Sequence, residues 1–118
     1  MDTPSHLKVS ADTREEERSV CGFRQRLITK EHGAPLSITR LRTSNAQAHW
    51  HRHTHECYYV LAGEGKLLID NEEVSVQAGD CVWIMPGHQH QAIGSFETLI
   101  ICTPPLEPDD VILGTPPE

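Results

Sequence analysis

Short strand-like segments separated by turn residues run through most of this 118-residue chain. They follow one another at a spacing of roughly 8–12 residues, which is typical of an all-β sandwich or barrel. Turn-forming residues separate them, for example at Gly63-Glu64-Gly65, Asp70-Asn71-Glu72 and Pro86-Gly87. No segment repeats its apolar residues with the 3.6-residue period of a helix, so helices should be minor. The pattern therefore predicts one all-β domain.

Two polar ends flank the predicted barrel. Residues 1–20 are rich in charged and hydroxyl side chains and form a polar lead-in, whereas residues 105–118 form a proline-rich tail. Proline has no N–H to donate to a sheet, so regular strands should stop near Cys102. The apolar run Val111-Ile112-Leu113 can fold back onto the body. We therefore expect the barrel over residues 21–104.

Charge and hydropathy exclude some partners. The formal net charge is −7, and the ten Lys and Arg residues are spread along the chain. Nucleic-acid backbones are bound by clustered basic side chains, so no nucleic acid is expected. No apolar run approaches the roughly 18 residues of a membrane span, and the amino terminus has no apolar stretch typical of a signal peptide. We expect a cytoplasmic protein, with its four widely spaced cysteines as reduced, mostly buried thiols.

Eight histidines in one short chain are the main functional clue, since histidine is the commonest metal-binding side chain. On a strand, His49 and His51 would point to the same face. If residues 52–55 form a turn, Glu56 begins the returning strand, and His90 supplies a third nitrogen from another strand. Three imidazoles and one carboxylate suit Fe, Mn, Ni, Cu or Zn as the divalent ion. A six-coordinate ion would keep two positions open.

Three neighbouring histidines leave alternatives open. If His51, His53 and His55 held the metal instead, Glu56 would be too close to them in sequence to act as a further ligand. We therefore interpret His53 and His55 as solvated or as outer neighbours of the site. His88 is interpreted as an exposed turn residue or as an outer or substrate contact.

The alternation of side chains along strands predicts further residues around the metal. Gln47 should share a face with His49, and Tyr58 should share a face with Glu56, so these two are the candidate catalytic residues. Arg40 and Arg42 point inward in one register and outward in the other. An inward arginine would favour an anionic substrate.

Two motifs in this order resemble the conserved motifs of the cupins. The first is His49-Trp50-His51-(x4)-Glu56-(x6)-Gly63, and the second runs from Gly79 through Pro86-Gly87 to His90. Met85 replaces the first proline of the second motif and Gly94 replaces its asparagine, but neither position carries a ligand. The resemblance covers about residues 21–104.

The resemblance implies a double-stranded β-helix, a jelly-roll barrel, with a metal inside near one end. It implies His49, His51, Glu56 and His90 as the ligands, and a homodimer as the assembly. Cupin chemistry varies widely, so the fold does not fix the reaction. The first hypothesis is an iron-dependent, dioxygenase-like oxidoreductase acting on a small organic molecule. The alternatives are a metal-dependent isomerase or lyase, and a non-catalytic module that binds a small ligand.

Overall fold

The structure, a computed structural model, describes residues 4–118 and folds them into two antiparallel sheets. One sheet contains β1 (Glu17–Arg18), β2 (Gly22–Ile28), β3 (Ser37–Thr43), β5 (His55–Ala62), β8 (Cys81–Ile84) and β10 (Glu97–Thr103). The other contains β4 (His49–Trp50), β6 (Glu64–Ile69), β7 (Glu72–Gln77), β9 (His90–Ile93) and β11 (Ile112–Leu113). Residues 1–3 of the predicted lead-in lie outside the described part of the chain.

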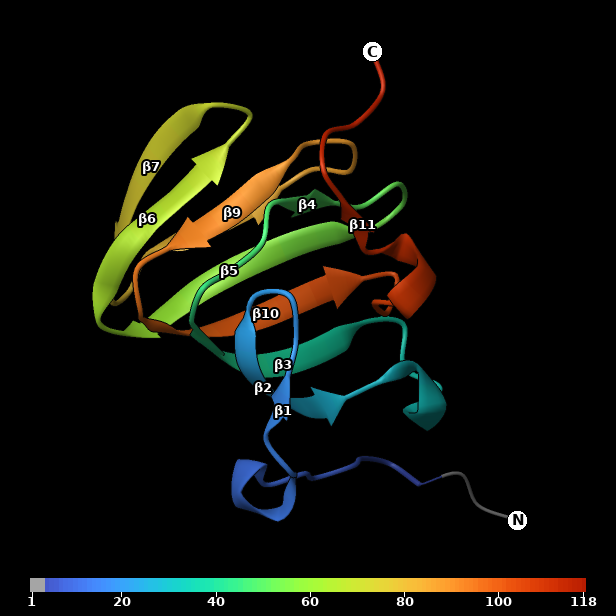
Figure 1. The fold of residues 1–118 in the computed structure, drawn as a ribbon. Coiled ribbons are helices and arrows are strands. Elements are labelled where there is room, and N and C mark those ends of the chain that lie inside the picture. Colours follow the sequence, from blue (N-terminus) through green and yellow to red (C-terminus); the bar gives the residue numbers. More distant parts are fainter. Residues whose placement is uncertain (1–3) are drawn as a thin grey trace.

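The strand order is that of a jelly roll. The six-stranded sheet runs β1-β2-β3-β10-β5-β8, and the five-stranded sheet runs β11-β4-β9-β6-β7. Figure 1 shows the two sheets splayed around a common interior, and from β3 to β11 the chain crosses between the sheets at every step except that from β6 to β7. This architecture confirms the predicted all-β, double-stranded β-helix fold.

Helices are minor, as the sequence predicted. Among residues 4–118 they are limited to the 3-10 turns η1 (Ala11–Thr13), η2 (Lys30–His32) and η3 (Pro108–Asp110). None of the helices in this range has the length and hydropathy needed to cross a membrane.

The core lies between the sheets, because alternate residues of each strand point inward. In β5, Tyr58 and Val60 are buried, whereas Tyr59 between them is exposed. In β8, Ile84 faces the core and Trp83 faces outward. The four cysteines are free, as expected, but Cys102 is the only one of them that is fully buried.

Two strands differ from the sequence-based expectation. β4 ends at Trp50, so His51 lies just past the strand on which it was expected to alternate with His49, and no residue range was predicted for β9, the strand that carries His90. β9 is short and polar at its start, so it lacks the apolar alternation that marks a strand. In the tail, β11 pairs with β4, with Ile112 opposite Trp50 and Leu113 opposite His49. The C-terminal tail therefore pairs with the strand that carries His49.

Gly65 marks a close approach between β6 and the end of β9. A Cβ atom there would lie 2.6 Å from the carbonyl oxygen of Ile93 and 2.7 Å from Cδ1 of Phe96, which is buried. Forcing atoms into a packed core costs about 1–3 kcal/mol. We expect Gly65→Ala to lower the free energy of unfolding by about that amount, measured by urea denaturation.

The matched control is Lys66→Ala, the next residue along β6. Lys66 is exposed, and its ion pair with Glu73 joins two solvated side chains. Such surface changes stay within about 0.5 kcal/mol. An equal loss in the two variants would contradict the close packing at Gly65.

Candidate metal centre

Four side chains from both sheets meet in the interior. His49 lies on β4 and His90 lies directly opposite it on β9. His51 follows the end of β4, and Glu56 enters from β5 in the other sheet. One possible ligand atom from each of the four lies within 4.8 Å of the others, and all four residues are buried. The structure thus brings together the four residues that the spacing singled out.

Backbone carbonyls orient the three imidazoles. The Nδ1 atoms of His49, His51 and His90 lie 2.9, 2.7 and 3.0 Å from the carbonyl oxygens of Gln47, Asp110 and His88. A carbonyl oxygen only accepts, so each Nδ1 carries the proton and donates it. Each Nε2 is therefore left with a lone pair. This arrangement is typical of metal-ligating histidine, whose other nitrogen is held by an outer partner.

The Nε2 atoms of His51 and His90 have no hydrogen-bond partner, although both are buried. They lie 3.2 and 3.4 Å from the two carboxylate oxygens of Glu56, but without hydrogen-bond geometry. Lone pairs facing a carboxylate in a buried place are costly without a cation between them. The residues present therefore fit one divalent transition metal ion, and the cluster could hold it.

The charge states of His49 and Glu56 suit ligation. Burial, with His90 close by, lowers the pKa of His49 to about 4. Burial alone would raise the pKa of Glu56, but its contacts with His51 and His90 hold it well below the usual range. Burial would lower the pKa of His51, yet Glu56 and Asp110 together raise it. Around neutral pH the site therefore contains a carboxylate and a neutral His49 imidazole.

The three other histidines considered as alternatives lie outside the cluster. His53 is exposed, and the half-buried His55 accepts a hydrogen bond from the indole N–H of Trp83 at 3.2 Å. His88 is exposed and is paired with Asp70. The alternative set of ligands, His51, His53 and His55, therefore does not converge on one site.

The two candidate catalytic residues lie in different surroundings. Tyr58 is buried on the inner face of β5, with its ring centre 6.4 Å from that of His90. Gln47 has an exposed side chain, so the prediction that it shares a face with His49 is wrong. β4 begins only at His49, so strand alternation does not extend back to Gln47. Gln47 instead contributes its backbone carbonyl.

Asp110 is a contributor that sequence reasoning missed. Besides its carbonyl contact with His51, its carboxylate accepts the backbone N–H groups of Arg52, His53 and Thr54 at 2.7, 3.1 and 3.1 Å. It also accepts the Thr54 hydroxyl at 2.6 Å. The tail thereby fixes the loop that carries His51. No sequence signal connects these segments, which are more than 50 residues apart.

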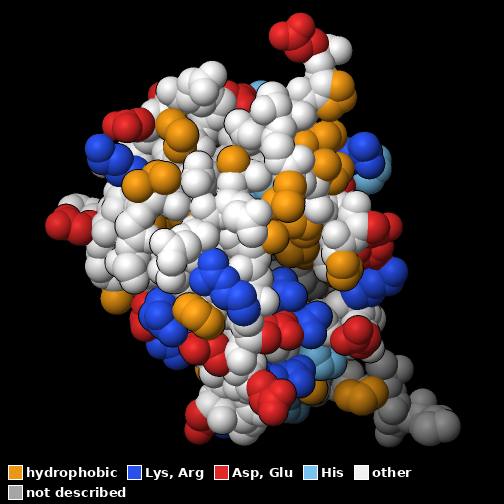
Figure 2. All heavy atoms as spheres, in the orientation of Figure 1, with side chains coloured by type: hydrophobic (Ala, Val, Ile, Leu, Met, Phe, Trp, Pro, Cys, Tyr) orange, Lys and Arg blue, Asp and Glu red, His pale blue; other side chains and the backbone are white. Residues whose placement is uncertain are grey.

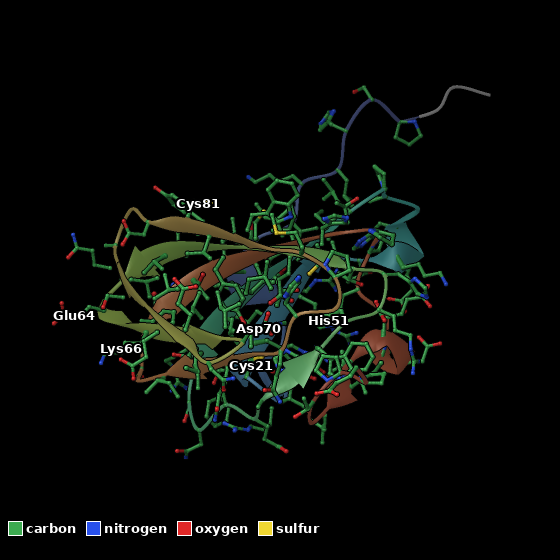
Figure 3. All side chains as sticks on the ribbon, turned by 90° about the horizontal axis from the view of Figure 1, so that it is seen from above. Cys21, His51, Glu64, Lys66, Asp70 and Cys81 are labelled. Carbon is green, nitrogen blue, oxygen red and sulfur yellow. The ribbon has the colours of Figure 1, made fainter. Side chains whose placement is uncertain are left out.

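A cavity of about 440 Å³ opens beside the cluster and is lined by His49, His51 and Glu56. Tyr58, Leu41 and Ile100 add to its wall, as do residues of the C-terminal segment. In Figure 3, Cys21 and His51 lie inside the barrel between the sheets, whereas Glu64 and Lys66 lie at its far end. This volume is within the range of small-molecule sites, about 300–1,000 Å³.

Solved structures with the same fold cover nearly the whole chain. A protein from Planctomyces limnophilus is 24% identical with a TM-score of 0.85, over 92% of this chain and 96% of that one. Streptomyces Pac13, described as a nucleoside dehydratase, is 17% identical with a TM-score of 0.83, over 97% and 95%. Ectoine synthase from P. lautus is 14% identical with a TM-score of 0.75, over 96% and 93%. At these identities the likeness concerns the fold.

Sequence comparison places the motifs in a family. An uncharacterised protein of Methanocaldococcus jannaschii is 35% identical over 71 residues, which span 57% of this chain and 57% of that protein. The chain thus spans little more than half the length of this relative. The family model described as "Cupin domain" matches residues 42–102, which include all four clustered residues. With two sheets in jelly-roll order and that match over half its length, the chain belongs to the cupin family.

Proposed function

We propose that this protein is a metal-dependent enzyme of dioxygenase-like type that acts on a small organic molecule. The observation that carries the proposal is the convergence of three imidazole Nε2 atoms and the Glu56 carboxylate beside a cavity of small-molecule size. His49, His51, Glu56 and His90 would hold one divalent ion, with iron as the first choice. Four ligands leave two positions of a six-coordinate ion for other molecules.

A bound transition metal supplies Lewis acidity or activation of dioxygen, according to its identity. The protein's own residues do the remaining work. The apolar wall, which includes Leu41 and Ile100, keeps water away from the substrate. Burial raises the pKa of Tyr58 well above its usual value, and Cys21 and Glu56 raise it further. Its phenol therefore stays protonated and can donate a hydrogen bond to a substrate oxygen in the cavity.

A second candidate is a metal-dependent lyase or isomerase. The observation that favours it is the fold shared with Pac13, described as a nucleoside dehydratase, and with ectoine synthase. The same four residues would then hold a metal that polarises a substrate oxygen without changing its redox state.

Metal content and oxygen consumption separate these candidates. The protein should be purified from its native host, subjected to elemental analysis and screened with small acids, phenols and sugars. We expect stoichiometric iron and oxygen uptake that matches substrate loss. Zinc or nickel with turnover under anaerobic conditions would contradict the dioxygenase and favour the lyase or isomerase. Ligand binding without any turnover would contradict both and favour a binding module.

A further inference from the structure

Two arginines of β2 line the cavity, Arg24 half-buried and Arg26 exposed to solvent. Arg24 is opposite Leu41 in the β2–β3 pair, and Arg26 is opposite Thr39. Directly opposite residues of paired strands share a face of the sheet. Leu41 is buried in the core, and both partners line the cavity together with the two arginines. The inward arginines were not predicted, because sequence reasoning considered only the two on β3.

The arginines of β3 point the other way. Arg40 and Arg42 are opposite Gln25 and Phe23, and both are exposed on the outer face. Arg40 pairs with Glu97 at 3.2 Å and Arg42 pairs with Glu16 at 3.3 Å. Neither lines the cavity beside the metal cluster. The outward register therefore answers the question that the sequence left open.

The inward pair carries more positive charge than its partner offsets. The Nε atoms of Arg24 and Arg26 lie 3.0 and 2.7 Å from the same carboxylate oxygen of Glu17. Two guanidinium groups thus share one carboxylate. Figure 2 shows basic and acidic side chains interspersed on the surface around β1 and β2.

The terminal nitrogens of the inward pair are uncommitted. Within residues 4–118, their contacts with Glu17 run through Nε, and no hydrogen bond uses their terminal nitrogens. The terminal nitrogens of arginine form a planar fork that matches an oxyanion.

The other charged side chains at the cavity are either paired already or negatively charged. Lys30 is paired with Glu107, and Glu31 accepts a hydrogen bond from the Thr29 hydroxyl at 3.2 Å. Glu56 belongs to the metal cluster. Of the basic side chains that line the cavity, the β2 arginines are therefore the ones whose terminal nitrogens remain free to bind an anion.

We propose that Arg24 and Arg26 bind an oxyanion group of the substrate, so that the substrates are small organic acids with a carboxylate or a phosphate. This inference rests on the proposed function for the role of the metal, but the anion site itself is built by β2. One end of the substrate lies at the arginines and the other end reaches toward the cluster across the same cavity.

The test compares anions with a neutral molecule of the same shape. The full-length protein, loaded with Zn²⁺, is titrated with benzoate, phenyl phosphate and benzamide and followed by NMR of the arginine Nε–H signals. We expect at least one anion to bind more tightly than benzamide. The variant R24Q/R26Q should bind that anion about tenfold or more weakly than the wild type, because it lacks the charge-assisted hydrogen bonds of the two guanidinium groups. Benzamide binding and metal content should stay unchanged.

The control R40Q/R42Q removes the same charge from the outer face and should leave anion binding within about twofold, because exposed charges across the sheet are screened. If R24Q/R26Q does not fold, R24K/R26K serves in its place. It keeps the positive charge next to Glu17 but lacks the planar guanidinium group, and its affinity for the anion should be at least about threefold lower than that of the wild type.

Three outcomes would overturn the inference: no preference of the wild type for either anion, unchanged anion binding in R24Q/R26Q, or an equal loss in R40Q/R42Q. Elemental analysis of the same samples separates this inference from the proposed function. A chain that holds no metal but binds anions through β2 would refute the metal proposal alone.

Discussion

A His51→Ala variant should lose nearly all of its bound metal while the barrel stays folded. His51 supplies one of four converging ligand atoms, and its Nδ1 is already fixed by Asp110. Losing an outer partner of a ligand costs about 10–100-fold in metal affinity, so losing a ligand itself should cost at least that much. Metal content per chain, measured after dialysis at equal protein concentration, checks this expectation.

The matched control is His53→Ala, two residues along the same loop. The His53 side chain is exposed and lies outside the cluster, so this variant should keep the metal content of the wild type. Equal metal content in His51→Ala and wild type would reject His51 as a ligand. Equal loss in both variants would mean that the loop as a whole, rather than the imidazole, determines metal binding.

An Asp110→Ala variant should weaken metal binding without touching a ligand side chain. The carboxylate accepts the N–H groups of Arg52, His53 and Thr54 and the hydroxyl of Thr54. Without it these groups, of which those of Thr54 are buried, lose their partner, and the loop that presents His51 is free to move. We expect a loss of about 10–100-fold in metal affinity and of about 2–3 kcal/mol in the free energy of unfolding.

The neighbouring Asp109 provides the comparison, because it is exposed and makes none of these hydrogen bonds. Asp109→Ala should match the wild type in affinity and stability. Burial alone would raise the pKa of Asp110, but the bonds from Thr54, Arg52 and His53 lower it. Its stabilising effect is therefore present above the ordinary carboxyl pKa and is lost as the pH falls through the lowered value. Wild-type affinity in Asp110→Ala would contradict the role of the tail in positioning His51.

The buried cluster of four residues could be predicted because its signals are local and chemical. His49, His51 and Glu56 are close in sequence, and His90 follows the Pro86-Gly87 turn and begins another strand. Turn residues between short segments gave the fold class in the same way. Both the convergence of the four side chains and the jelly-roll architecture are confirmed.

The remaining parts depend on register and on contacts between distant segments. Strand alternation failed at Gln47, because β4 is too short to extend to it. The register between β2 and β3 determines which arginines face the interior of the barrel. The alternation of residues along these two segments does not show which of their two faces is the inner one. Asp110 lies in the C-terminal tail and contacts His51 through its carbonyl oxygen. In the sequence, the prolines of this tail indicate only that regular strands end there.

Anomalous diffraction from crystals of the natively purified protein, recorded at the absorption edge of the metal found by elemental analysis, tests the central claim most directly. We predict one strong peak per chain, bounded by Nε2 of His49, His51 and His90 and by the carboxylate of Glu56, at bond lengths of about 2.0–2.2 Å. A peak elsewhere, or His90 and Glu56 turned away from an ion held by other groups, would contradict it.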